Sequence, residues 1–291
     1  MGMRIRTNVN SLISQRFLND NVNNQNRSLE RLSSGYRINR SSDDAAGLAV
    51  SESIRAKTRG LNVAKRNGND AISMIQVAEG SMNEMSNILI RLRELTVQAS
   101  SDTIGSAERG YLNREYTQLV DEIDRIAMTT EFNSLKLFEA DNQSEFVIQV
   151  GTNYTGADEN KDTISISLEG LKFKSEDLGL GNQDEIGPSA EGDEGPDRNS
   201  IAEKLTYIDN AINRIASERA TLGSIQSRLG SAINNLGVNV ENLRTANSRI
   251  KDTDFAEETS NLAQARVLLA SSTSVLAQAN ANPDMALQLL R

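Results

Sequence analysis

Carboxylates are the strongest candidates for chemistry in this chain, because histidine and cysteine are both absent. That absence removes the commonest general base, thiolate nucleophiles, disulfides and most zinc ligands. The best carboxylate group is Asp158–Asp162, with Glu169 where a calcium loop would place its bidentate ligand. However, Thr163 stands where such a loop requires glycine. A solvated hairpin loop is the better interpretation, and we expect no enzyme, metal or cofactor.

Other short patterns have plain structural explanations. Asn142-Gln143-Ser144 and Asn153-Tyr154-Thr155 match the N-glycosylation acceptor, but three-residue patterns occur often by chance. Met74, Met82 and Met85 fall on or beside a helical stripe, which favours core packing over a ligand surface. We found no glycine pattern typical of nucleotide binding. The sequence therefore favours a structural protein.

Two long seven-residue repeats dominate the chain. Steps of four and three residues through Ile201–Ile250 meet fifteen positions, twelve of them apolar, and Val50–Ala99 gives the same proportion. Such a stripe can be buried only against a partner helix, and each helix would be ~75 Å long. Since a connection can turn back between them, we expect an antiparallel pair. Gly223, Gly230 and Gly237 recur beside the second stripe, where we expect another helix to approach closely.

Weaker helices stand at both ends of the chain. The first is expected over residues 5–32, with these apolar residues on one side: Ile5, Val9, Leu12, Leu18, Val22, Leu29 and Leu32. The last should begin after a cap at Asp254, and its stripe is Phe255, Leu262, Leu269 and Leu276. Asn282-Pro283 should restart it before Leu287, Leu289 and Leu290. Val267, Leu268 and Val275 lie beyond the stripe, so the ends need further copies of the chain to cover them.

The segments between the long helices differ in pattern. A third helix is expected over residues 112–126, and alternation around Phe146–Val150 and Ile164–Leu168 predicts a β-hairpin. Ser175–Ser200 holds eight acidic residues against Arg198 alone, a net charge of −7 out of −9, and should be a loop or disordered tip. The remainder is nearly balanced, so nothing indicates nucleic-acid binding.

These elements predict a mainly α fold, an elongated antiparallel helical bundle or coiled coil with a small β-hairpin region and paired N- and C-terminal helices. We expect five segments: a terminal helix with connector (1–42), the first half of the rod with the hairpin (43–174), an acidic loop (175–200), the second long helix (201–252) and the last helix (253–291). No apolar run reaches membrane length, which predicts no membrane insertion. A cytoplasmic protein and one exported without a cleaved signal both remain open.

Five blocks of the sequence resemble bacterial flagellin. They are Asn8–Leu12, Leu29–Asn39, Asp43–Ala49, Arg93–Ala99 and Leu276–Asn280. The resemblance implies a flagellar filament subunit that is exported unfolded by the flagellar type III apparatus and polymerises outside the cell beneath a cap. It implies an export chaperone and junction proteins as partners, and terminal helices that become ordered on assembly. The expected polymerisation residues are Ile5, Val9, Leu12, Val22, Leu29, Leu32, Phe255, Leu262, Leu269, Leu276, Leu287 and Leu290.

The same resemblance suggests a second interaction. Ile90–Val97 resembles the stretch that a host Toll-like receptor recognises, with Arg91, Leu95 and Glu115 at matching positions. Two alternatives to a filament subunit are a hook-filament junction protein and a cytoplasmic coiled-coil adaptor. The block Leu276–Asn280 and the receptor-like stretch favour flagellin over the junction protein. An adaptor would not need paired weak termini.

Overall fold

The computed structural model describes residues 7–138, 145–152, 162–167, 169–181, 186–187 and 198–288, with only the backbone at 169, 198–199 and 282–288. The chain forms two compact units, residues 1–58 with 241–291 and residues 59–240. The division falls inside the two long helices. Within the described residues, no helix combines the length and hydropathy that a membrane crossing requires.

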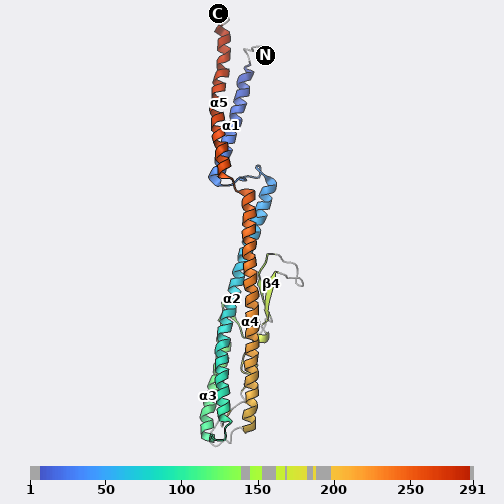
Figure 1. Ribbon diagram of the computed structural model, residues 1–291, viewed down its shortest axis with the longest axis vertical. Helices are drawn as coiled ribbons and strands as arrows, with labels where there is room; N and C mark the ends of the chain where they lie inside the picture. Colours follow the sequence, from blue (N-terminus) through green and yellow to red (C-terminus); the bar gives the residue numbers. More distant parts are fainter. Residues whose placement is uncertain are drawn as a thin grey trace. The chain divides into compact units, whose positions relative to one another are not determined.

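The unit of residues 59–240 is built on the two long helices, α2 (Ala45–Ala99) and α4 (Arg198–Lys251). From Leu61 to Ala99, every predicted stripe position of α2 is buried. The α4 stripe from Ile201 to Val240 is buried or half-buried throughout. These heptads were predicted correctly, because the two helices lie side by side (Figure 1) and residues of both stripes belong to one hydrophobic core.

Contacts between the two helices show that they are antiparallel. Arg93 Nε lies 2.8 Å from Asp209 Oδ1, whereas Arg219 reaches Glu79, earlier in α2, at 3.8 Å. Positions in α2 therefore decrease as those in α4 increase. All these side chains are at least partly exposed, so the ion pairs contribute little to the free energy of folding. The apolar seam provides most of the stability.

The third helix, α3 (Ser106–Thr129), packs on the same core. Tyr116, Ile123 and Ala127 are buried, and the helix begins after Gly105, where the stripe of α2 has ended. Thr130 donates to Ser81 Oγ at 3.0 Å and so joins the end of α3 to α2. The predicted third helix is confirmed.

Two small antiparallel sheets follow α3. β3 (Glu145–Gln149) and β4 (Thr163–Ser167) form the predicted hairpin, with Phe146 opposite Ile166. β1 (Glu131–Phe132) and β2 (Leu135–Lys136) form a second hairpin that was not predicted. Its turn places Asn133 and Ser134 at φ 51° and 65°, the left-handed conformations of a tight hairpin turn, without the glycine that usually signals one.

The acidic stretch packs partly on the core. After the short 3₁₀ helix η1 (Glu169–Leu171), Leu178, Leu180 and Ile186 are buried in the core, and α4 begins at Arg198. Asp124 accepts from both the backbone N–H and the hydroxyl of Ser175, at 2.6 and 2.7 Å. Residues 175–181 and 186–187 contain neither helix nor strand, as predicted for a loop, and three apolar residues among the charges bind this loop to the core.

The glycine prediction was also wrong. A Cβ added at Gly223, Gly230 or Gly237 would meet no atom within 4 Å, so no helix in the described part of the single chain requires these glycines. At Gly68, in contrast, a Cβ would lie 3.0 Å from Ile233 Cγ1. Within this chain, close helix approach therefore occurs at Gly68 and not at the three repeated glycines.

We predict that Gly230→Ala raises the free energy of unfolding of the monomer by about 1 kcal/mol, because alanine favours the helix and meets no neighbour. Urea unfolding followed by circular dichroism measures the change. Gly68→Ala is the matched control, and its gain should be smaller because Ile233 must shift. If the Gly230→Ala monomer is less stable than the native one, position 230 does contact a neighbouring group and the prediction fails.

Candidate assembly surface

The terminal helices α1 (Val9–Ser34) and α5 (Phe255–Gln288) lie side by side and antiparallel, as predicted (Figure 1). Asn21 Nδ2 donates to Ser272 Oγ at 2.7 Å near the middle of the pair. Arg31 Nη1 lies 3.5 Å from the buried carboxylate of Glu258 at the end of α1. The paired ends of the chain therefore form one described body with a defined register.

The seam between these helices is polar on one side and apolar on the other. In α1, positions three and four residues apart are buried or half-buried: Ser11, Ser14, Leu18, Asn21, Gln25, Ser28 and Leu32. In α5 the corresponding row is Glu258, Leu262, Ala265, Leu269, Ser272, Leu276 and Ala279. α5 thus supplies most of the apolar surface of the seam, and α1 supplies mainly small and amide side chains.

Most apolar residues of α1 consequently point away from α5. Val9, Leu12 and Phe17 are 44, 57 and 55% exposed, and Val22 and Leu29 are also exposed. The prediction of a single apolar side was wrong. Nine residues separate Val9 from Leu18, which places them on opposite sides of a helix. Of the predicted set, Leu18 and Leu32 face the seam.

α5 also has two apolar faces. Leu262, Leu269 and Leu276 are half-buried in the seam, whereas Phe255, Val267, Leu268 and Val275 are 58, 69, 45 and 54% exposed. The helix continues to Gln288, so the predicted restart at Asn282-Pro283 was wrong. Ile5 and Leu290 lie outside the described residues, as does the side chain of Leu287.

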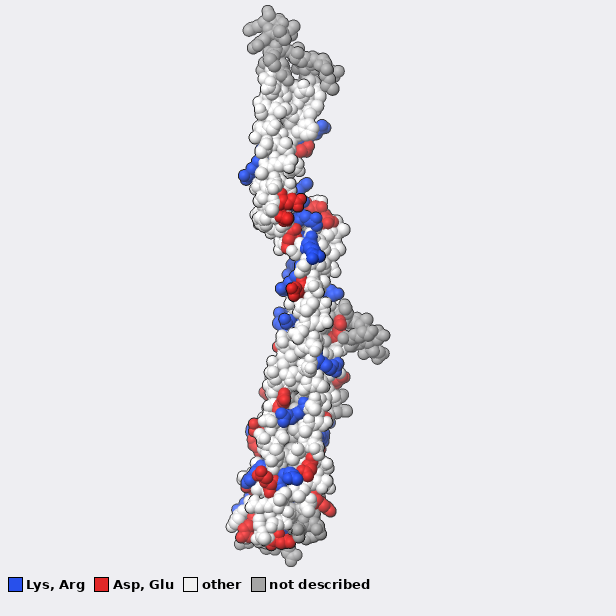
Figure 2. All heavy atoms as spheres, in the orientation of Figure 1, with Lys and Arg blue, Asp and Glu red and all other residues white. Residues whose placement is uncertain are grey.

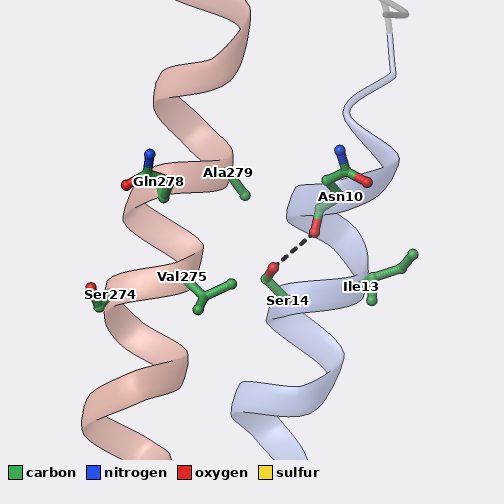
Figure 3. A pocket seen from close by; sticks show the side chains of 7 residues that line it. All are labelled: Asn10, Ile13, Ser14, Ser274, Val275, Gln278 and Ala279. Carbon is green, nitrogen blue, oxygen red and sulfur yellow. Dashed lines mark hydrogen bonds between the residues drawn. The ribbon is translucent and has the colours of Figure 1, made fainter. Parts of the chain in front are cut away.

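Charge is sparse on this pair of helices. Lysine, arginine and acidic side chains gather near the connector and are few along the rest of α1 and α5 (Figure 2). A shallow groove runs between the helices, lined by Asn10, Ile13, Ser14, Ser274, Val275, Gln278 and Ala279. Val275 and Ala279 extend from α5 toward α1 in this groove (Figure 3). The surface is therefore apolar and uncharged enough to be buried by another molecule.

The connectors at the other end of the pair bind to each other. Gly35 ends α1 at φ 74°, and its carbonyl accepts from Thr253 N at 3.0 Å. Arg37 N donates to Lys251 O at 2.7 Å, and Tyr36 and Asp252 form an antiparallel bridge. These backbone hydrogen bonds tie the break after α1 to the break between α4 and α5.

Carboxylates cap the helices that follow the connectors, and one of them is the predicted cap Asp254. Asp254 Oδ1 accepts from Ala256 N at 2.8 Å to begin α5, and Asp44 Oδ1 accepts from Gly47 N at 2.8 Å in α2. Asp43 turns back instead, and the backbone N–H of Arg40 holds the pKa of its carboxyl below the ordinary value. Local capping chemistry therefore accounts for the connector on both sides.

The three receptor-like residues differ in exposure. Arg91 donates to Glu115 Oε1 at 2.9 Å and to Glu94 at 3.1 Å, and the Glu115 hydrogen bond is the chief cause that raises the pKa of Arg91. The Arg91 and Glu115 side chains are 48 and 44% exposed. Leu95 is 0% exposed, so it lies in the core and offers no surface to a receptor.

The glycosylation patterns and most of the acidic group singled out in the sequence cannot be placed in the structure. Asn142–Ser144, Asn153–Thr155 and residues 158–161 lie outside the described residues, as does the side chain of Glu169. Among the side chains that are described, no group of three or more carboxylates could hold a metal ion.

Sequence reasoning missed the polar seam residues Asn8, Ser11 and Asn21. Their signal was the three- and four-residue spacing of small and amide side chains in α1.

Comparisons with known proteins agree with this architecture. Residues 5–143 match the bacterial flagellin N-terminal helical region, and residues 205–290 match the C-terminal helical region. Flagellins of Halalkalibacterium halodurans and Bacillus subtilis are each 39% identical, over 99% of this chain and 100% of theirs. A crystal structure of Bacillus cereus flagellin, 30% identical, covers 59% of this chain and 88% of that one with a TM-score of 0.47. The two family matches and the full-length relatives show that the chain belongs to the bacterial flagellin family, the structural subunits of the flagellar filament.

Proposed function

We propose that this subunit polymerises by burying the outward apolar faces of α1 and α5 against other copies of itself. The observation that supports this most strongly is the exposure of Leu12, Phe17 and Val267, each more than half exposed on helices that are already paired. One neighbour covers only one side of a helix, so pairing of α1 with α5 leaves these residues in water. Other subunits supply the missing cover.

The energy of this burial is sufficient to drive assembly. Removing about 1,000 Å² of apolar surface per subunit contributes on the order of 25 kcal/mol before the costs of ordering the chain. The scarcity of charge along α1 and α5 lowers the cost of bringing these surfaces together (Figure 2). The seam residues Leu262, Leu269 and Leu276 then act indirectly, because they hold the two helices in the pair that presents the surface.

We extend the proposal to the export route and to further partners. The subunit leaves the cell unfolded through the flagellar type III apparatus, escorted by an export chaperone, and adds to the distal tip beneath the cap, beyond the junction proteins. The asparagine-rich α1 supports this route, because asparagine is a poor helix former and the helix depends on its partner.

A host Toll-like receptor is a further proposed partner. Arg91 and Glu115 are exposed and bonded to each other across α2 and α3, so they offer a fixed polar patch. Leu95 acts only as a core residue that supports the helix beneath this patch.

A charge on the outward face should prevent assembly. Val267→Asp places a carboxylate on a side chain that is 69% exposed in the monomer, so the monomer should fold normally and form no filaments. Val267→Thr, similar in shape and uncharged, should assemble more weakly but still form filaments. Circular dichroism of the monomer and electron microscopy after seeding measure the two properties. Normal filaments from Val267→Asp would contradict the proposed surface.

Substitutions at Leu95 and Arg91 should differ in their effect on the free energy of unfolding. Leu95→Ala should lower the free energy of unfolding by about 2–5 kcal/mol, because it leaves a cavity in the core. Arg91→Ala should change it by less than about 1 kcal/mol, because the lost ion pairs are exposed. Thermal and urea unfolding of both variants measures the difference, and similar losses would show that the Arg91 patch is structural.

A further inference from the structure

The last part of α5 contains a proline in a position that normally breaks a helix. Proline has no backbone N–H and its ring crowds the carbonyl four residues earlier, so Pro283 leaves the Ala279 carbonyl without its helical donor. Nevertheless, α5 is continuous from Phe255 to Gln288. A buried carbonyl without a donor is costly, so another group must take the place of the missing N–H.

Asn8, at the start of α1, supplies that donor. Its side-chain Nδ2 donates to the Ala279 carbonyl at 2.7 Å, and Ala279 itself is only 5% exposed. The other end of the same amide, Oδ1, accepts from Ser11 N at 3.1 Å and caps α1. One side chain therefore completes the first turn of α1 and the proline-containing turn of α5.

A neighbouring hydrogen bond supports the same register. Ser11 Oγ donates to Asn280 Oδ1 at 2.7 Å, one residue beyond the Ala279 carbonyl. A shift of α1 along α5 by one turn, about 5.4 Å, would break both contacts and leave the Ala279 carbonyl unpaired. The bond from Asn8 is thus specific to a single alignment of the two helices.

We propose that Asn8 is a positioning residue that makes the ordering of α1 and the ordering of the end of α5 depend on each other. It does so by donating a hydrogen bond to the Ala279 carbonyl, which Pro283 leaves without a helical donor. Each end then completes its hydrogen bonds only when the other is in place. This deepens the proposed assembly surface and rests on it, because the surface exists only when α1 and α5 are paired in register. The ends therefore become ordered together and not one by one.

Two substitutions isolate the bond. Asn8→Ser keeps an oxygen that can cap α1 but removes the amide donor. Pro283→Ala restores an N–H to the Ala279 carbonyl and makes the donor of Asn8 dispensable. Asn8→Ala, which loses the cap as well, is the matched control. Hydrogen exchange is measured for peptides covering residues 9–20 and 269–281 in filaments of the full-length chain.

Asn8→Ser should speed exchange in both peptides by about fivefold, the loss expected for one hydrogen bond. In the Pro283→Ala background it should leave exchange in residues 269–281 unchanged, whereas Asn8→Ala should still speed exchange in residues 9–20. Equal effects of Asn8→Ser in both backgrounds, or an effect on residues 9–20 alone, would overturn the assignment. If the native chain forms no filaments, the assembly proposal fails, and the same exchange experiment on the monomer decides the role of Asn8.

Discussion

A helix in this chain has more apolar surface than one neighbour can cover, and the rest of the structure depends on how that surface is divided. In the unit of residues 59–240, the stripes of α2 and α4 match each other and the surplus is covered by α3 and by the segment before α4. Leu178, Leu180 and Ile186 belong to that cover. This unit can therefore bury its core within one chain.

The unit that contains the chain ends divides its surface differently. The apolar row of α5 meets a row of α1 that is mostly serine, asparagine and glutamine. Polar contacts such as the one from Asn21 to Ser272 fix the alignment, and most apolar residues of α1 are left on the outside. The pair is therefore held in register by hydrogen bonds while its apolar surface stays available to other subunits. This division suits the proposed assembly, in which the outward faces stay uncovered on the single chain and are buried between subunits.

Much of the fold could be predicted from the sequence, because heptads over fifty residues leave little ambiguity about partner and direction. The breaks at Gly35 and Asp252, the caps at Asp44 and Asp254, and the hairpin of β3 and β4 follow from equally local chemistry. Features that depend on a third partner could not be predicted. Leu95 lies beside the stripe position Thr96 and its burial becomes evident only from the packed core.

The assembly surface shows the same limit. The sequence pattern of α1 did not show which face Val9 and Leu29 occupy, because several faces of that helix are partly apolar. Pro283 is a sound signal for a helix break in isolation, but the amide of Asn8, more than 270 positions away in the sequence, donates to the Ala279 carbonyl that the proline leaves without a helical donor. Long-range hydrogen bonds of this kind have no local pattern.

Hydroxyl-radical footprinting of the native chain as monomer and as filament tests the central claim most directly, because it reports the exposure of individual side chains without mutation. Phe17 and Leu268, 55 and 45% exposed in the single chain, should react readily in the monomer and become strongly protected in the filament. If both residues react in filaments as they do in monomers, the outward faces of α1 and α5 are not the surfaces that hold the polymer together.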